Sequence, residues 1–371
     1  MHESPNSLQP TAYHPASIVM LVGIGNNDRG SAKLFSDAGR VVLIQDAYIE
    51  HIEVWEKGQR VFSGPETRIA SSRFLSEITF GLPGILRNIR NYRRHMANKP
   101  CDVIITSAYG QTFAGLFLRA MGKTRKVVCI LSDFLPPQGS LAVRCHRRIT
   151  GLLTSLAARF SDEVWGVSPR IPTLNANPHH YVLPLFVDDN HAPTDIRDEV
   201  GYIGFPSPDH ALDILFDICR KHDLKLNVFG DSPYLQSIKH LAPARTVFHG
   251  ITNDSSKING VLSRCFCGYA VYRNCSPNSY SYYGIPSKTL QFFASNTPVV
   301  TTNTAHFSQN ISRFQVGHVV EPIPEQIETA ILDLKTHFHV YSEAINQFRQ
   351  TWNKDVEHFH HTRIAELLAK P

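Results

Sequence analysis

The feature that most constrains the fold is a series of short apolar runs, separated by segments of helical length, that continues along the whole chain. Most runs are apolar throughout instead of alternating with polar residues, as expected for strands that are buried on both faces. Such strands belong to parallel sheets covered by helices, so the sequence predicts an α/β protein. The predicted strands are residues 17–22, 41–45, 102–106, 126–131, 163–167, 181–185, 200–204, 226–230, 246–250, 267–272, 298–302 and 317–320.

A polar link that contains proline and aspartate, residues 188–198, divides the predicted strands into two series. A chain of 371 residues has the usual length of two domains. We therefore expect an N-terminal domain of residues 1–190, a second domain of residues 191–350, and a C-terminal segment of residues 351–371 that crosses back to the first domain. Two doubly wound units leave a cleft between the carboxyl ends of their sheets, where ligands bind. The last predicted helices are residues 342–352 and 355–369.

The first strand leads into a glycine turn and a helix, which is how a Rossmann-type unit opens. Gly23 and Gly25 supply the first two glycines of the dinucleotide fingerprint G-x-G-x-x-G, but Asp28 occupies the third position. The chain also lacks a Tyr-x-x-x-Lys pair. Both facts count against a nucleotide-sugar epimerase or dehydrogenase, which would hold a dinucleotide at this turn.

Four motifs follow one another in the second series. Residues 202–204 read Tyr-Ile-Gly, residues 227–233 read Asn-Val-Phe-Gly-Asp-Ser-Pro, and residues 248–250 read Phe-His-Gly. Residues 284–300 read Gly-Ile-Pro-Ser-Lys-Thr-Leu-Gln-Phe-Phe-Ala-Ser-Asn-Thr-Pro-Val-Val. This order resembles the donor-binding domain of GT-B glycosyltransferases, whose pattern at the last motif is P-x-K-x-x-E-Y-x-A-x-G-x-P-V-V. The resemblance implies two Rossmann-like, doubly wound domains that face each other across a cleft and transfer a sugar from a nucleotide donor.

The last motif also suits an anionic ligand on physical grounds. Pro286 and Ser287 fit the first turn of a helix, whose free N–H groups and positive dipole end attract anions such as a nucleotide diphosphate. Lys288 adds a positive charge there, and Gln291 lies one turn further along the same side. The resemblance further implies that Gly204 lets the backbone approach the diphosphate.

Two departures from the family pattern bear on stereochemistry. Retaining members carry two glutamates eight residues apart at this motif, where this chain has Tyr283 and Gln291. The Lys288-x-x-Gln291 pair, with Tyr272 on the preceding strand end, instead resembles the inverting β-1,2-glucuronosyltransferase of xanthan-type exopolysaccharide assembly. That resemblance implies that these residues contact UDP, together with Ser287.

The same resemblance implies a loop carboxylate in the donor site, for which Asp254 is the nearest candidate. It also implies transfer of glucuronate from UDP-glucuronate to a polyprenyl-diphosphate-linked oligosaccharide in exopolysaccharide biosynthesis. Two alternatives stay open at this point. One is a retaining GT-B hexosyltransferase, and the other is a catalytically silent module that binds a nucleotide sugar.

An inverting transfer needs a base that deprotonates the acceptor hydroxyl. Asp133 follows the predicted strand 126–131 directly, so it lies at a carboxyl end in the first domain, and the resemblance places the catalytic aspartate at a comparable distance before the lysine. The alternatives are that Asp133 only caps a turn, or that Asp46 or Glu50 is the base. Because no Asp-x-Asp motif is placed to hold a divalent ion, we expect no metal and no cofactor beyond the UDP-sugar substrate.

Positive charge is concentrated in the first domain, since residues 60–160 hold 16 Lys and Arg against 4 Asp and Glu. Within this region, residues 80–94 place Leu82, Ile85, Leu86, Ile89 and Tyr92 on one stripe beside arginines, and residues 144–160 repeat the pattern. Basic amphipathic helices bind anionic membrane surfaces, although many pack into a core instead. We expect an anionic membrane as partner and no nucleic acid.

The termini and cysteines bear on the compartment. The first nine residues are polar, no run is long enough to span a bilayer, and the seven cysteines are scattered. These features predict a reduced cytoplasmic protein, bound peripherally to the inner face of the plasma membrane.

Overall fold

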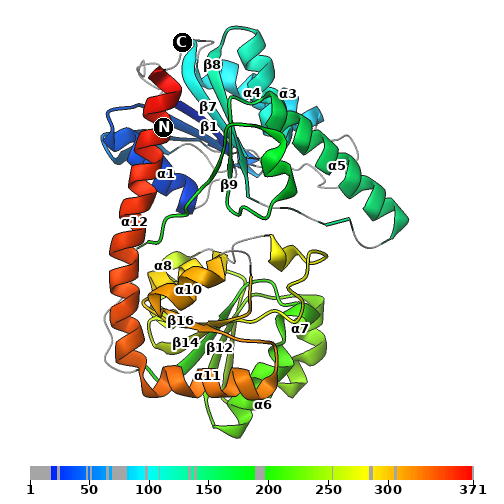
Figure 1. The fold of residues 1–371 in the computed structure, drawn as a ribbon, viewed down its shortest axis with the longest axis vertical. Coiled ribbons are helices and arrows are strands. Elements are labelled where there is room, and N and C mark those ends of the chain that lie inside the picture. Colours follow the sequence, from blue (N-terminus) through cyan, green and yellow to red (C-terminus); the bar gives the residue numbers. More distant parts are fainter. Residues whose placement is uncertain are drawn as a thin grey trace, which may run out of the picture.

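The computed structural model describes residues 18–22, 26–46, 49–50, 52–63, 67–68, 82–96, 99–107, 109–132, 134, 136–137, 140–188, 197–252, 254–283, 287–304 and 307–369. Two α/β units lie one above the other, and one long helix runs along the side of both (Figure 1). This arrangement confirms the predicted fold class. Gly23 and Gly25 of the expected first turn lie outside the described residues.

The first sheet has eight strands in the order β10-β9-β8-β7-β1-β2-β4-β5. Its six strands from β10 to β2 pair in parallel, and β1 is buried along its whole length, as an uninterrupted apolar run predicts. The antiparallel hairpin β4–β5 and the separate pair β3–β6 were not predicted. The strands are β1 (Ile18–Val22), β2 (Val42–Asp46), β3 (Ile49–Glu50), β4 (Ile52–Glu56), β5 (Gln59–Ser63), β6 (Thr67–Arg68), β7 (Cys101–Ser107), β8 (Thr124–Leu131), β9 (Glu163–Gly166) and β10 (His180–Val182).

The second sheet is parallel throughout, with the order β13-β12-β11-β14-β15-β16. β11 lies between β12 and β14, so the strands that follow β11 in the chain are added first on one side of it and then on the other. The carboxyl end of β11 is therefore the topological switch point, where such sheets bind ligands. The strands are β11 (Glu199–Ile203), β12 (Lys225–Phe229), β13 (Thr246–Gly250), β14 (Cys265–Ala270), β15 (Val299–Thr301) and β16 (Gly317–Val319).

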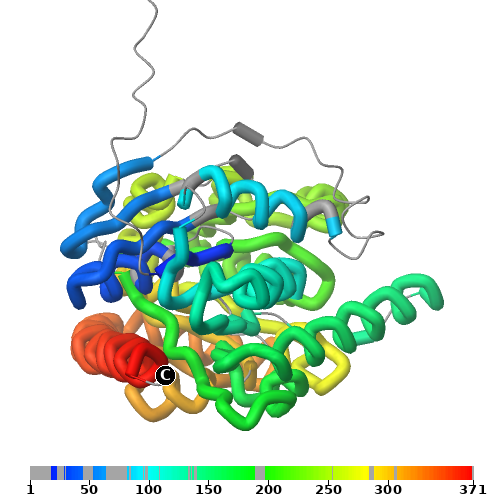
Figure 2. Tube along the Cα trace, turned by 90° about the horizontal axis from the view of Figure 1, so that it is seen from above, coloured from blue at the N-terminus to red at the C-terminus, as the bar shows by residue number. Residues whose placement is uncertain are grey.

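Helices cover both sheets and bury the apolar faces of the strands (Figures 1 and 2). The α-helices are α1 (Asn26–Asp37), α3 (Leu82–His95), α4 (Tyr109–Ala120), α5 (Leu141–Phe160), α6 (Leu212–Lys221), α7 (Pro233–Ile238), α8 (Ser255–Leu262), α9 (Ser287–Ala294), α10 (Phe307–Phe314), α11 (Pro324–Thr336) and α12 (Phe338–Ala369). Short 3-10 turns are η1 (Pro172–Ala176), η2 (Pro208–His210), η3 (Lys239–Leu241) and η4 (Tyr280–Tyr282).

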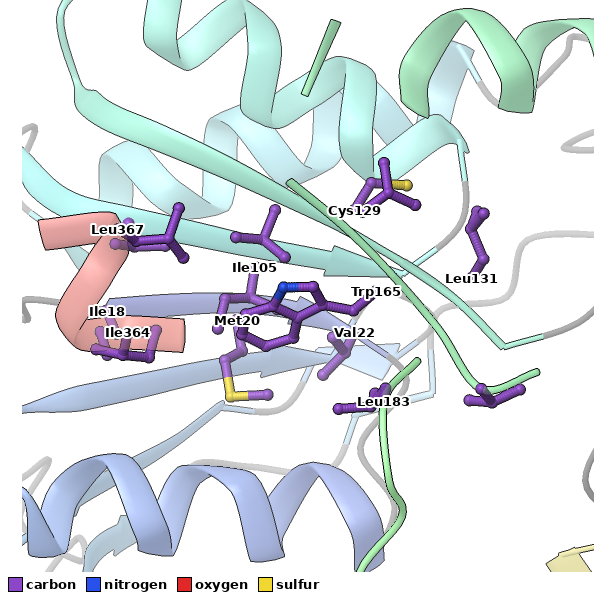
Figure 3. Packing of buried hydrophobic residues seen from close by; sticks show 14 of the residues in the cluster. Ile18, Met20, Val22, Ile105, Cys129, Leu131, Trp165, Leu183, Ile364 and Leu367 are labelled. Carbon is purple, nitrogen blue, oxygen red and sulfur yellow. The ribbon is translucent and has the colours of Figure 1, made fainter. Parts of the chain in front are cut away.

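The two C-terminal helices that the sequence pattern predicted, residues 342–352 and 355–369, form one helix of 32 residues, α12. Its polar middle, which suggested a break, lies against the connection between the units, where Asn353 bonds both backbone groups of Val187 and Trp352 donates to Leu185 O at 2.7 Å. Near its carboxyl end, Ile364 and Leu367 join the core of the first sheet (Figure 3). The same helix therefore packs on both units.

The two amphipathic segments differ in how their apolar stripes are used. In α3, Ile89 and Tyr92 are buried in the first unit, whereas Leu82 and Leu86 are exposed. In α5, only Ala157 and Ala158 are buried, and the helix projects from the body of the molecule (Figures 1 and 2). Within the described helices, none combines the length and apolar content that crossing a membrane requires.

Candidate functional site

The carboxyl ends of β11, β12 and β13 line an open cavity of about 210 Å³. Backbone bonds join the three ends, since Gly204 N–H donates to Phe229 O and Gly230 N–H donates to Gly250 O. Gly204 and Gly230 have φ of 132° and 123°, and a Cβ at Gly230 would lie 1.8 Å from Gly204 O. Glycine at both positions thus keeps bare backbone at the cavity. The lining residues are Ile203, Gly204, Phe205, Phe229, Gly230, Asp231, Gly250, Ile251, Thr252 and Ile258.

Lys288, in the first turn of α9, points its ammonium group toward this end of the sheet. The side chain as a whole is half-buried, but Nζ itself is buried and has no hydrogen-bond partner among the described residues. Nζ lies 4.8 Å from the ring centroids of both Tyr202 and Tyr272, and burial lowers its pKa to about 7. A buried cation without an anion is costly, so this position is suited to an anionic ligand.

A second buried polar atom, Tyr202 Oη, also has no hydrogen-bond partner among the described residues. Thr289 Oγ1, in the first turn of α9, is likewise unpaired within the described part of the chain. A Cβ built on Gly204 would lie 3.6 Å from Lys288 Nζ and 3.9 Å from Tyr202 Oη, so these two atoms both border the backbone at the end of β11. Because buried polar groups are nearly always paired, the neighbouring unpaired atoms Lys288 Nζ and Tyr202 Oη indicate a position where a ligand could complete the hydrogen bonding.

A third ring, that of His210, packs against the two tyrosines beside the Lys288 ammonium. His210 of η2 makes edge contacts with Tyr202 and Tyr272, with ring centroids 6.0 and 4.9 Å apart. Ser207 N–H donates to His210 Nδ1 at 3.0 Å, while burial, followed by the charge of Lys288, lowers the pKa of His210 to about 3. Neither His210 nor Tyr202 was singled out from the sequence. Tyr202 belongs to the motif at 202–204, but an apolar strand pattern does not show which side chains reach a ligand.

Gln291 and Ser287 belong to α9, as predicted. The structure describes the side-chain contacts of Gln291 but not those of Ser287. The Gln291 amide donates to Asn259 Oδ1, which also accepts from Ser295 Oγ at 3.2 Å, so Gln291 ties α9 to α8. Ser287 begins the helix, and its side chain lies outside the described residues. Contacts of both residues with UDP therefore stay predictions.

Asp254 caps α8. Its Oδ1 accepts from Lys257 N–H at 3.1 Å, and the side chain is exposed. A cap satisfies a free N–H group of the first helical turn, which accounts for an aspartate here without a ligand. The contact between Asp254 and the donor stays a prediction.

Asp133 lies outside the described residues, so its orientation is not defined. Its chain neighbour Phe134 is described and makes an edge contact with Tyr283 of the second unit, with centroids 4.6 Å apart. Arg170 lies over the Tyr282 ring, 4.4 Å from its centroid. The loop that follows β8 therefore meets the segment that precedes α9.

Tyr283 occupies the position of the first glutamate of retaining enzymes. Its buried contacts explain why an aromatic residue is suited to this position. It is buried, donates from Oη to Pro277 O at 2.8 Å, and packs against the first unit. The side chains of the alternative bases, Asp46 at the end of β2 and Glu50 in β3, lie outside the described ones. Within the described ranges, no three His, Cys, Asp or Glu side chains are grouped as metal ligands.

Comparison with known proteins gives relatives in structure alone. No protein-family model matches the sequence, and no curated protein sequence matches it. A sucrose-phosphate synthase from Thermosynechococcus elongatus superposes with a TM-score of 0.69 at 14% identity, covering 96% of this chain and 100% of its own. Anabaena HepE in complex with UDP-glucose gives 0.62 at 15% identity, covering 95% and 100%.

A third structure, a UDP-forming trehalose-phosphate synthase from Burkholderia xenovorans, gives a TM-score of 0.63 at 10% identity, covering 96% of this chain and 99% of its own. These likenesses extend over both units and over the long helix that joins them. At this level of identity they establish architecture. The chain therefore has the fold of GT-B glycosyltransferases.

Proposed function

We propose that this protein is a glycosyltransferase that binds a UDP-sugar at the carboxyl end of β11 and transfers the sugar to an acceptor held by the first unit. The observation that carries the proposal is the buried, unpartnered Lys288 Nζ between Tyr202 and Tyr272. A nucleotide diphosphate would supply the missing anion. Relatives in fold whose structures name UDP or UDP-glucose support the choice of nucleotide.

The residues around Lys288 have complementary tasks in this proposal. The Lys288 ammonium would stabilise the charge that develops on the leaving diphosphate, and the first-turn N–H groups of α9 would add their dipole. Gly204 and Gly230 would let the phosphates approach the backbone, because neither carries a side chain. The diphosphate charge would then be met without a metal ion.

We propose an inverting course, with Asp133 as the base that deprotonates the acceptor hydroxyl. The absence of the retaining glutamate pair supports this course, because Tyr283 makes an interdomain contact and Gln291 is an uncharged amide. The contact of Phe134 with Tyr283 supports Asp133, because it brings the loop after β8 against the donor-binding unit. The finer proposal is glucuronate transfer to a polyprenyl-diphosphate-linked oligosaccharide.

A lipid-linked acceptor requires contact with a membrane, and we propose that α5 makes it. The helix combines Arg144, Arg148 and Arg159 with apolar side chains that the first unit does not cover. Such a surface binds anionic lipids through charge and apolar contact together, which would hold the enzyme on the inner face of the membrane. The exposed apolar residues of α5 are Leu141, Val143, Ile149, Leu152, Leu156 and Phe160.

Calorimetry with UDP on the full chain tests the donor site. We expect UDP to bind, and Lys288→Ala to weaken binding by about 1.5–3 kcal/mol, the range for a charge-assisted hydrogen bond. A folded Lys288→Ala variant with unchanged UDP affinity would refute the assignment. Lys257→Ala is the matched control, because this lysine is exposed on α8.

Turnover separates an enzyme from a silent binding module on the same fold. Release of UDP from UDP-glucuronate or UDP-glucose, followed with lipid-linked and free acceptors, is expected for the transferase. UDP binding without turnover of any donor would support the binding module. The anomeric configuration of the product, read by NMR, distinguishes the inverting course from the retaining one.

A further inference from the structure

Lys288 is held in surroundings that disfavour its ammonium form when the site is empty. Its Nζ is buried, has no hydrogen-bond partner among the described residues, and lies against the rings of Tyr202 and Tyr272. Ring faces attract a cation, but by far less than the cost of removing a charge from water. Burial accordingly lowers the pKa of Lys288 to about 7.

Among the described residues, no neighbouring negative charge offsets this cost. From β11, Tyr202 is uncharged because burial raises its pKa, and the same holds for Tyr272 after β14. From η2, His210 is neutral because its burial lowers the pKa of the imidazole. Asp209, the carboxylate beside His210 in sequence, accepts from Asn274 N–H at 3.0 Å, and none of the described carboxylates pairs with Lys288.

We propose that Lys288 is largely an uncharged amine in the empty site at mildly alkaline pH, and that it takes up one proton from solvent when the diphosphate of the nucleotide binds. The inference rests on the proposed function and adds that donor binding is coupled to protonation. The proton binds to the lone pair of Nζ, and the resulting ammonium donates hydrogen bonds to phosphate oxygens. No covalent bond to the ligand forms or breaks.

The direction of the pH dependence follows from the sign of the shift. An anion within a few ångströms favours the charged form, so the pKa of Lys288 rises when the diphosphate is present. The charge contributes to affinity fully below the pKa of the empty site and is lost progressively above it. With that pKa at about 7, affinity should fall roughly 15-fold between pH 7.0 and 8.5.

Isothermal titration calorimetry of UDP into the full chain measures the proton directly. The binding enthalpy, plotted against the ionisation enthalpy of several buffers, gives the number of protons taken up. We expect about 0.5 protons at pH 7 and about 0.9 at pH 8. Uridine, which carries no phosphate, should give no uptake.

The matched control is Lys288→Arg, because a guanidinium stays charged throughout this pH range. This variant reports the protons that UDP itself exchanges, and its affinity for UDP should change less than about 2-fold between pH 7.0 and 8.5. Wild-type uptake that equals the uptake of Lys288→Arg would overturn proton coupling and leave the UDP site intact. Failure of the folded wild-type protein to bind UDP would overturn both proposals.

If the arginine does not fit between the two tyrosine rings, the wild-type protein still decides the question. Lysine-selective 15N labelling allows Lys288 Nζ to be followed by NMR while the pH is raised in the absence of nucleotide. A midpoint near 7 that moves upward when UDP is added supports the proposal. A midpoint near the ordinary lysine value of about 10.4 in the empty site refutes it.

Discussion

A buried ion pair joins the C-terminal helix to the first sheet. Arg363 of α12 donates to both carboxylate oxygens of Glu163 in β9, through Nε at 3.2 Å and through Nη2. Only 8% of the Arg363 side chain and 2% of the Glu163 side chain are exposed. Trp165 Nε1 also donates to Glu163, and the Arg363 guanidinium lies 3.8 Å from the centroid of the Tyr181 ring.

Replacement of Arg363 by methionine keeps most of the side-chain volume and removes the charge. Glu163 would then be a buried carboxylate whose one remaining side-chain donor, among the described residues, is Trp165 Nε1. Breaking a buried pair by removal of one partner destabilises a protein by about 3–5 kcal/mol, because the other charge stays buried. Adding Glu163→Gln should recover much of this loss, since the neutral amide costs less to bury and its oxygen can still accept from Trp165.

Urea unfolding followed by tryptophan fluorescence measures these changes. The control is Arg220→Met, which breaks an exposed pair with Asp217 on α6, where the two side chains are 52% and 76% exposed, together with an exposed contact to Leu241 O. This control should cost less than about 1 kcal/mol. If Arg363→Met lowers the free energy of unfolding no more than the control does, the pair is not buried in solution. That result would refute the stabilising ion pair between α12 and β9.

Three further outcomes are expected. Tyr202→Phe should weaken UDP binding by about 0.5–1.5 kcal/mol in calorimetry. Thermal stability should not fall, because the deleted hydroxyl has no partner among the described residues. Unchanged affinity would exclude a contact between this hydroxyl and UDP. Asp133→Asn should lower turnover by roughly 10²–10⁴ while UDP affinity stays near wild type, and normal turnover would transfer the role to Asp46 or Glu50. Leu152→Glu should reduce flotation with anionic vesicles, whereas equal flotation would place the membrane contact elsewhere.

The strand pattern predicted most of the architecture because its cause is local. A strand that is buried on both faces must be apolar throughout, and β1, β9 and β14 are entirely buried. The β4–β5 hairpin escaped prediction because β5 is largely exposed and its residues are mostly polar. The single helix α12 escaped prediction because the polar residue Asn353 at its middle binds the backbone of Val187, a contact between distant parts of the chain.

The residues of the candidate site also differ in whether their surroundings depend on local sequence or on contacts between distant segments. The place of Lys288 in the first turn of a helix could be predicted from sequence, because proline favours the first turn of a helix. Asp254 was chosen by its place in a loop, and the structure gives it the local role of a helix cap. Gln291 was chosen by its match to the family motif and by helical spacing, but its amide donates to Asn259 on a neighbouring helix, a contact that neither of these predicts.

By itself, the sequence determined the α/β class, the two series of strands and the lysine at the start of α9, because apolar periodicity and helix-start residues act over a few positions. Only the tertiary structure decided the state of that lysine. Tyr202, His210 and Tyr272 come from three separate segments and converge on one ammonium group because the parallel order of β11 and β14 brings their carboxyl ends together. The burial of Lys288 Nζ results from the packing of these three side chains, so it cannot be predicted from the local sequence around Lys288.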